Sequence, residues 1–272
     1  MKLEFYCPHW GSEELPFETF LSKVKDAGYD GVEMSFPMDE TERNDLAEKI
    51  KKLNLKLIAQ HWETVDKDFL LHKINYEKRL RNLTATNPLF INSQTGKDYY
   101  SFEQNAELIS IADKVASDTG IKVIHETHRG KFSFAAHVTK QFLDKLPDLK
   151  ICLDISHWCC VAETLLEDQE DAVKTAISHA YHVHSRVGFT EGPQIMDPRA
   201  EENGVIVERH ISWWQKIIDE AKLKGRKTFT ITPEFGVPPY LQLLPYTKQP
   251  IYSQWDVNVY MMHLLKKKLV AE

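Results

Sequence analysis

Four side chains able to bind a metal ion stand at the ends of four successive strand-like segments of this chain. They are Glu126 in KVIHETHRG, Asp154 in KICLDISHW, His184 in YHVHSRVG and Glu234 in TFTITPEFG. A buried strand ordinarily ends in turn residues, and a carboxylate there gains little from packing. One such acid could be a strand cap or half of a salt bridge. Four in matching contexts indicate one divalent-metal site.

The alternation of side chains along a strand supports this convergence. Successive side chains point to opposite faces, so Glu126 shares a face with Ile124 and His184 shares one with His182. If these faces point to the axis of a closed sheet, the candidate ligands meet at its carboxyl-terminal edge. Carboxylates with one imidazole suit Mn²⁺, Mg²⁺, Co²⁺ or Zn²⁺. Four protein ligands leave room for substrate oxygens only around a five- or six-coordinate ion, which favours Mn²⁺.

Short β-rich runs alternate with longer helical patterns eight times along the chain. The strand-like runs begin near Leu3, Gly31, Leu55, Pro88, Ile121, Asp148, Ala180 and Lys227. The helical stretches with the clearest bounds are Glu18–Ala27, Thr41–Leu53, Phe102–Thr119 and Val207–Lys224. Such alternation, at intervals of about thirty residues, is typical of βαβ units in a parallel sheet.

Eight units predict an α/β fold, a (β/α)8 TIM barrel, as a single domain over residues 1–272. An open doubly wound sheet would usually carry a Gly-rich phosphate loop after its first strand, whereas that segment reads YCPHWGSEE. The 42% hydrophobic content is ample for one large core. Two loops, 188–208 and 236–252, are unusually long and should lie over the C-terminal face because they follow the last two strands.

Composition excludes several classes of partner. The net charge of −6 and the pI near 6.1 give no electrostatic footprint for nucleic acid. The first residues lack the apolar region of a signal peptide, and no run approaches the length of a membrane span. The four cysteines match no CxxC spacing, and we interpret them as reduced thiols. We therefore expect a cytoplasmic protein that binds neither nucleic acid nor a membrane.

Two short motifs complete the pattern of candidate ligands. A DxxH runs from Asp154 to His157 and an HxH from His182 to His184, between the glutamates that end the fifth and eighth strands. In this order the chain resembles, over essentially its full length, the xylose isomerase-like barrel superfamily. That group holds sugar phosphate isomerases/epimerases and ketose 3-epimerases. The resemblance implies that one Mn²⁺-like ion is bound by Glu126, Asp154, His184 and Glu234.

The resemblance also implies a reaction, the isomerisation or epimerisation of a sugar or sugar phosphate. A divalent ion held by a carbonyl and a neighbouring hydroxyl acidifies the C–H bond between them, so proton transfer would pass through a cis-enediolate. By similarity to the epimerases, Glu126 and Glu234 would be both metal ligands and the catalytic acid and base. Isomerisation and epimerisation both stay open, and the absence of a Gly-rich phosphate nest in EFGVPPY leans towards an unphosphorylated substrate.

Six residues are candidates for contact with a small carbohydrate substrate: His61, Trp62, His128, His157, Trp158 and Arg186. Of these, His157 occupies the family's position for a substrate or secondary metal contact. Arg186 could clamp a substrate oxygen or phosphate, or form a plain salt bridge. The tryptophans, with Trp10 and Phe235, could form apolar walls against a sugar ring, or simply pack between helices and strands.

Other candidates are Asn92 and Gln94, near the end of the fourth strand, and Glu33 on the second strand, which we expect to point inward. The Pro-rich 236–252 loop is a candidate lid or a contact in a homo-oligomer.

Two rival functions share the same fold. An AP endonuclease-like phosphodiesterase would carry an Asp-x-His about a dozen residues after the metal-binding histidine of strand seven. This chain has Asp197-Pro-Arg199 there, and a guanidinium cannot ligate a metal. The second rival is a non-catalytic sugar-binding barrel, which nothing in the sequence excludes.

Overall fold

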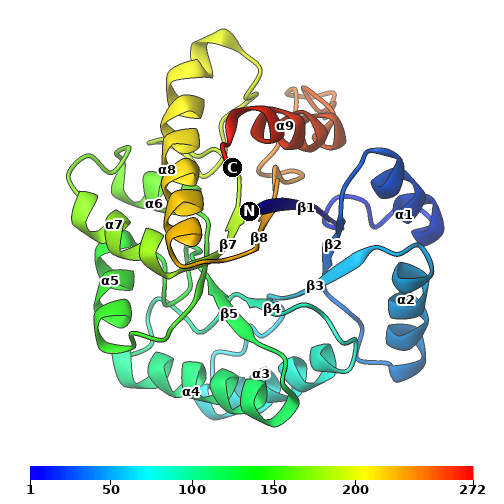
Figure 1. The fold of residues 1–272 in the computed structure, drawn as a ribbon, viewed down its shortest axis with the longest axis vertical. Coiled ribbons are helices and arrows are strands. Elements are labelled where there is room, and N and C mark those ends of the chain that lie inside the picture. Colours follow the sequence, from blue (N-terminus) through cyan, green and yellow to red (C-terminus); the bar gives the residue numbers. More distant parts are fainter. Residues whose placement is uncertain (272) are drawn as a thin grey trace.

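The computed structural model describes residues 1–271 as a closed parallel barrel in which every strand is hydrogen-bonded to the next and β8 to β1 (Figure 1). The strands are β1 (Lys2–Pro8), β2 (Gly31–Met34), β3 (Lys56–His61), β4 (Ile91–Ser93), β5 (Val123–Glu126), β6 (Ile151–Leu153), β7 (Ala180–His184) and β8 (Thr228–Thr232). The prediction of a single-domain (β/α)8 TIM barrel is confirmed, while position 272 lies outside the described residues.

The helices form a ring around the strands (Figure 1). They are α1 (Phe17–Asp26), α2 (Glu40–Lys52), α3 (Phe69–Thr84), α4 (Phe102–Thr119), α5 (Ala136–Lys145), α6 (Ser156–Ala162), α7 (Glu170–His179), α8 (Gly204–Leu223) and α9 (Gln254–Lys268), with a 3₁₀ turn η1 (Glu201–Asn203) before α8. The ring buries its apolar faces against the outer side of the barrel. For example, α8 buries Trp213, Trp214, Ile217 and Ile218.

The ends of α4 show how the local sequence sets a helix boundary. Ser101 and Gln104 form a reciprocal capping box at its start, and Gly120 ends it with a φ of 76°. The predicted helix Phe102–Thr119 is therefore confirmed residue for residue. By contrast, α8 begins at Gly204, three residues before the predicted Val207. The 188–208 loop is shorter than expected because η1 and the first turn of α8 occupy its last residues.

Side-chain alternation divides the barrel into an inner and an outer layer. A small separate cluster holds the inward apolar residues Tyr6, Ile58, Phe90, Ile124 and Cys152. Their strand neighbours point out to the main core beneath the helices, which contains Phe5, Leu57, Ile91 and Ile151. The inner apolar cluster forms the floor of the barrel, and the residues two positions farther along each strand stand above it.

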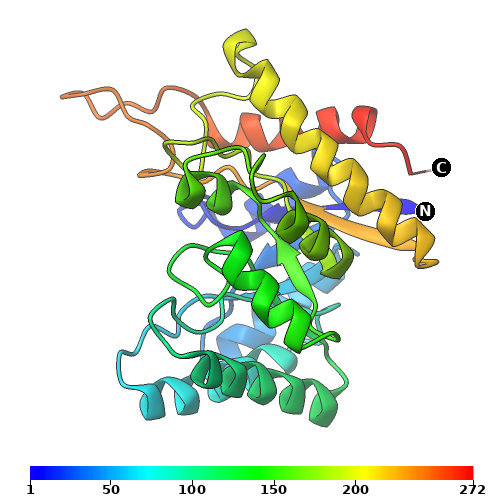
Figure 2. The ribbon, with the colours of Figure 1, turned by 90° about the vertical axis from the view of Figure 1, so that its left-hand side faces the viewer.

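The two long loops meet above the C-terminal ends of the strands. The Gly236 backbone N–H donates to Gln194 Oε1 at 2.7 Å, and Gln194 Nε2 donates to Tyr252 at 3.2 Å. The tip of the 236–252 loop, orange in Figure 2, projects well beyond the neighbouring loops, and its Tyr246 is 98% exposed. A contact of this loop with a second copy of the chain stays a prediction.

The length and hydropathy of the helices decide whether any of them could span a membrane. Within residues 1–271, none of them is long and apolar enough to cross a bilayer.

Gly31 allows the close pairing of β2 with its neighbours. It pairs with Tyr6 and Lys56, and a Cβ there would lie 2.2 Å from the Lys56 carbonyl oxygen. We expect Gly31→Ala to lower the free energy of unfolding by about 1–3 kcal/mol through overpacking, measured by urea denaturation. The control is Gly204→Ala at the start of α8, where a Cβ meets nothing within 4 Å. A Gly31→Ala protein as stable as the control would contradict this account.

Candidate metal centre and active site

The four predicted ligands come together at the C-terminal end of the barrel. Glu126, Asp154, His184 and Glu234 each offer a ligand atom, and these atoms all lie within 4.8 Å of one another. All four side chains are buried, with Glu234 the most exposed at 3%. Glu126 ends β5, Asp154 follows β6, His184 ends β7, and Glu234 comes two residues after β8. Adjacent strands of one closed sheet therefore supply the whole cluster.

His184 is oriented by Glu33 from the opposite side of the barrel. Its Nε2 lies 2.9 Å from Glu33 Oε1 and 3.1 Å from Asn92 Nδ2. Its Nδ1 is directed to the cluster, 2.9 Å from Glu234 Oε2 and 3.7 Å from Glu126 Oε1. The 2.9 Å contact does not meet hydrogen-bond geometry, so this buried nitrogen has no hydrogen-bond partner within residues 1–271. A carboxylate behind a histidine is the usual arrangement that orients a metal ligand.

Asp154 presents a second buried ligand atom without a partner. Its Oδ1 accepts hydrogen bonds from the backbone N–H and hydroxyl of Ser156, which fix the carboxylate. Its Oδ2 finds no hydrogen-bond partner in the described part of the chain, and lies 3.7 Å from His157 and 3.8 Å from Arg186. Unpaired buried polar atoms are rare and costly. Two in one cluster of ligand residues fit a site that binds a cation.

The electrostatics of the cluster are those of crowded, dehydrated carboxylates. Burial raises the pKa of Glu126 to about 8, and the nearby charges of Glu234 and Asp154 add to the rise. Burial likewise raises the pKa of Asp154. Burial alone would also raise the pKa of Glu234, but His184 and Arg186 outweigh it and lower that pKa to about 2. His184 and Arg186 thus compensate the negative charge of Glu234 more fully than the charges of the other two carboxylates. A bound divalent cation would supply the missing positive charge.

Arg186 connects the cluster to the neighbouring cavity. It forms an ion pair with the Glu234 carboxylate, and its Nε donates to the Glu234 carbonyl at 2.8 Å. Its guanidinium also lies 4.6 Å from the ring centroid of Tyr240. These contacts hold Glu234 in place and leave the planar face of Arg186 against an aromatic ring.

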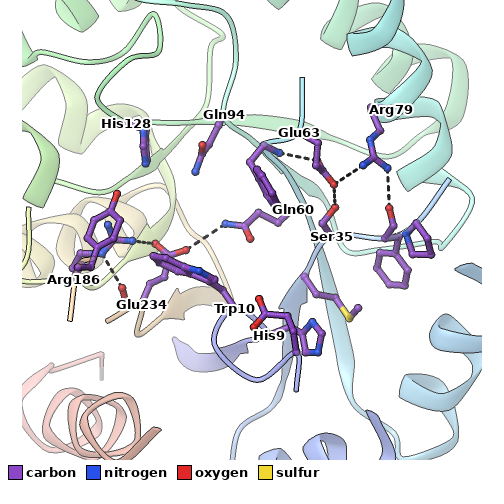
Figure 3. Close-up of a pocket in the computed structure, with 16 residues that line it drawn as sticks. His9, Trp10, Ser35, Gln60, Glu63, Arg79, Gln94, His128, Arg186 and Glu234 are labelled. Carbon is purple, nitrogen blue, oxygen red and sulfur yellow. Dashed lines mark hydrogen bonds and ion pairs between the residues drawn. The ribbon is translucent and has the colours of Figure 1, made fainter. Parts of the chain in front are cut away.

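A cavity of about 560 Å³ opens beside the cluster. Figure 3 shows Arg186, Glu234, His128 and Gln94 at one end, and Ser35, Glu63 and Arg79 at the other. Gln60 lies between these ends, and Trp10 lies near the first, with its ring 5.7 Å from the Arg186 guanidinium. Gln60 Nε2 donates to Glu234 Oε1 at 3.3 Å, and Gln94 Nε2 lies 3.3 Å from Glu126 Oε1.

The predicted substrate contacts divide into three groups. Arg186, Trp62 and His128 line the cavity. His157 is fully buried beneath it, with its ring centroid 3.9 Å from that of His128 and its Nε2 3.3 Å from Arg186 Nη1.

His61 and Trp158 point away from the cavity, so we no longer propose them as substrate contacts. The His61 ring is completely buried, 3.0 Å from Ser93 Oγ and 2.7 Å from Thr64 Oγ1. Trp158 is also completely buried and donates its Nε1–H to the Ser133 carbonyl at 2.9 Å. Both residues are part of the packing around the barrel.

Several cavity residues were missed from the sequence, among them Arg79, Gln60 and Tyr240. Gln60 could have been found, because it shares the inward parity of Ile58, whereas His61 has the outward parity. Tyr240 lies in the 236–252 loop, where no periodic signal exists.

Asp197 and Arg199 pair with each other shortly before η1, in the segment between β7 and α8. Arg199 Nε lies 2.9 Å from Asp197 Oδ1, and its Nη2 lies 2.7 Å from Oδ2. The carboxylate is therefore occupied by a guanidinium, which argues against an additional metal ligand there.

Comparison with known proteins identifies the family. A sequence model described as xylose isomerase-like TIM barrel matches residues 21–234. The chain therefore belongs to the xylose isomerase-like TIM barrel family. A search of curated proteins finds no match.

Solved structures with the same fold cover nearly the whole chain. One is a sugar phosphate isomerase/epimerase from Parabacteroides distasonis, 14% identical, covering 98% of both chains with a TM-score of 0.61. Another is the 3-keto-D-glucoside 4-epimerase YcjR from E. coli, 12% identical, covering 98% of this chain and 100% of that chain with a TM-score of 0.61. A third is described as the probable 3-DHS dehydratase AsbF from Bacillus anthracis, 17% identical, covering 98% and 99% with a TM-score of 0.59. At these identities the likeness establishes the fold.

The unpaired Oδ2 of Asp154 gives a direct test of metal binding. We expect saturating Mn²⁺ to stabilise the wild-type protein by about 2.7 kcal/mol at a hundredfold excess over Kd. Asp154→Asn should lose most of this gain without lowering the stability of the metal-free protein, because its amide is neutral where burial penalises a charge. Thermal unfolding with and without Mn²⁺ measures both. Asp168→Asn, at an exposed carboxylate, should retain the full gain. A gain retained in Asp154→Asn would remove this residue from the ligand set.

Glu33 should affect metal affinity through His184 without binding the ion. We expect Glu33→Gln to weaken Mn²⁺ binding about 10- to 100-fold, measured by calorimetric titration. Glu4→Gln is a matched control, since Glu4 is equally buried but pairs with Lys2 and Lys56. Equal affinities for the two variants would mean that Glu33 does not orient the ligand.

Proposed function

We propose that the protein is a divalent-metal-dependent isomerase or epimerase of a sugar or sugar phosphate, with Mn²⁺ as the favoured ion. The observation that carries the proposal is the buried set of three carboxylates and one imidazole beside a cavity with polar and aromatic walls. Carboxylate oxygens with a single nitrogen donor suit such an ion. The names of two structural relatives, a sugar phosphate isomerase/epimerase and a 3-keto-D-glucoside 4-epimerase, support the class of reaction.

The proposed ligands are Glu126, Asp154, His184 and Glu234. A divalent cation bound there would polarise a substrate carbonyl and acidify the neighbouring C–H bond. The ligand atoms need to be deprotonated to bind it, so binding would displace protons from groups with a raised pKa, such as Glu126.

Glu126 and Glu234 are the proposed acid and base. The two carboxylates approach the cluster from β5 and from the end of β8, so they can address different sides of a substrate. One removes the proton next to the carbonyl to give an enediolate, and a proton is then returned to carbon. Return to the former carbonyl carbon, together with passage of the hydroxyl proton from one oxygen to the other, produces isomerisation, whereas return to the other side of the original carbon produces epimerisation.

Neighbouring side chains keep these carboxylates in position. Gln94 donates to Glu126, while Gln60 and Arg186 donate to Glu234. Since Arg186 lines the cavity, it is also placed to hold a substrate oxygen. His128 lines the same end, and the pKa of its imidazole is lowered by burial to about 3, so it is neutral and can hydrogen-bond a hydroxyl.

The rival phosphodiesterase function has less support. The position that would need an imidazole holds Arg199, already paired to Asp197. A non-catalytic sugar-binding barrel is the remaining alternative, and a direct assay of proton transfer separates it from an enzyme.

Proton exchange tests the chemistry. In D₂O with Mn²⁺, we expect the wild-type protein to exchange the carbon-bound proton next to the carbonyl of a reactive sugar in an aldose and ketose panel, followed by NMR. Glu126→Gln and Glu234→Gln should each lower the exchange rate per bound Mn²⁺ by about 100- to 10,000-fold, the usual range for loss of an acid or base. Elemental analysis of bound Mn²⁺ separates loss of proton transfer from loss of metal.

Glu191→Gln, at an exposed carboxylate of the loop after β7, serves as the control and should exchange at the wild-type rate. Circular dichroism checks the fold of each variant. Full exchange in both Glu126→Gln and Glu234→Gln would show that the acid and base assignment is wrong. A wild-type protein that binds sugars without exchange would support the binding-protein alternative.

A further inference from the structure

The cavity extends well beyond the side chains that the proposed reaction uses. We define its distal lobe as Ser35, Phe36, Pro37, Trp62, Glu63 and Arg79. The lobe lies above the C-terminal ends of β2 and β3 and is continuous with the end that holds Glu234 and Arg186 (Figure 3). A volume of about 560 Å³ falls within the range of roughly 300–1000 Å³ that holds drug-sized ligands. A single pentose or hexose would leave much of it unfilled.

The charges in the distal lobe favour a neutral occupant. The charge of Arg79 is paired, because its Nη2 lies 2.9 Å from Glu63 Oε1, and its Nη1 donates to the Phe36 carbonyl at 2.9 Å. Of the residues that define the lobe, all of them described in the structure, Arg79 is the one cation and Glu63 neutralises it. Glu13 adds a further carboxylate to the cavity wall. A phosphate would therefore meet no unpaired positive charge in the lobe and one unpaired negative charge near it.

The lobe combines an aromatic platform with hydrogen-bond acceptors. The indole of Trp62 is 52% exposed, and Phe36 and Pro37 extend the apolar wall. The face of an aromatic ring carries negative charge density that attracts the C–H groups of a sugar ring. Glu63 is already engaged by Arg79, by the Ser35 hydroxyl and by the Trp62 backbone N–H. Ser35 Oγ gives its proton to Glu63 and keeps its lone pairs for a sugar hydroxyl, and Glu13, which accepts the Gly11 backbone N–H at 2.7 Å through Oε2, offers its other carboxylate oxygen. A purely apolar group would leave these acceptors without a partner, so a hydroxylated ring is the better match.

We propose that the substrate is a glycoside, in which the reacting sugar lies beside the metal-ligand cluster and a second, neutral sugar ring occupies the distal lobe against Trp62. This inference rests on the proposed function for the end at which chemistry occurs. The lobe itself is a binding site whose occupation can be measured without turnover.

Calorimetric binding in the presence of Mn²⁺ tests the lobe. The probes are fructose, fructose 6-phosphate and three disaccharides in which glucose is attached to O3, O4 or O6 of fructose: turanose, maltulose and isomaltulose. We expect at least one disaccharide to bind about tenfold or more tightly than fructose, a difference of about 1.4 kcal/mol. In Trp62→Ala this preference should fall below about threefold. Tyr246→Ala, at an exposed aromatic residue of the 236–252 loop, should keep it.

Three results would overturn the inference: fructose binding as tightly as all three disaccharides, fructose 6-phosphate binding more tightly than all of them, or a preference that survives in Trp62→Ala. Proton exchange in D₂O, measured on the same probes, separates the two proposals. Preference for a disaccharide without exchange supports the distal lobe and counts against the isomerase or epimerase. Proton exchange on fructose without a preference for any disaccharide supports the isomerase or epimerase and counts against the distal lobe as a sugar site.

Discussion

The central constraint on this structure is that three carboxylates are buried close together at the C-terminal end of the closed barrel, away from water. Glu126, Asp154 and Glu234 share that end with one imidazole, His184, and one guanidinium, Arg186. Burial of like charges at this separation is unfavourable, and it appears as raised pKa values at Glu126 and Asp154. A closed barrel can hold the charges together because the strands that carry them are fixed by hydrogen bonds on both sides.

The same closure gives the cluster support from across the barrel. Glu33 on β2 reaches His182 and His184 on β7, and Thr232 on β8 donates to Glu33 at 2.6 Å. Burial alone would raise the pKa of Glu33, but the two histidines lower it well below its usual range. This buried network fixes the ring of His184 with Nδ1 towards the other ligands. The buried cluster is therefore built on rigid strands, a property that precise binding sites require.

The cavity is built differently from the cluster beside it. Its walls come from the loops after β1, β2, β3 and β8, including Trp10, Phe36, Trp62 and Tyr240. Loop residues vary without disturbing the barrel, so one ligand set can be combined with many cavities. Gly236 shows this local adaptation, since a Cβ there would lie 2.2 Å from the indole of Trp10. The strands thus fix the buried cluster, whereas the loops shape the cavity beside it.

The sequence by itself determined the barrel and singled out the four buried side chains that meet at its C-terminal end, Glu126, Asp154, His184 and Glu234. Strand and helix periodicity repeats eight times, and ligand residues at strand ends share the parity of inward apolar residues such as Ile124. The same parity would have selected Gln60 instead of His61. Only the tertiary structure decided that Trp158 packs inside the protein, that Tyr240 lines the cavity, and that Glu63 neutralises Arg79. The physical reason is that strand periodicity is a local property of the backbone, whereas loop contacts depend on residues far apart in the chain.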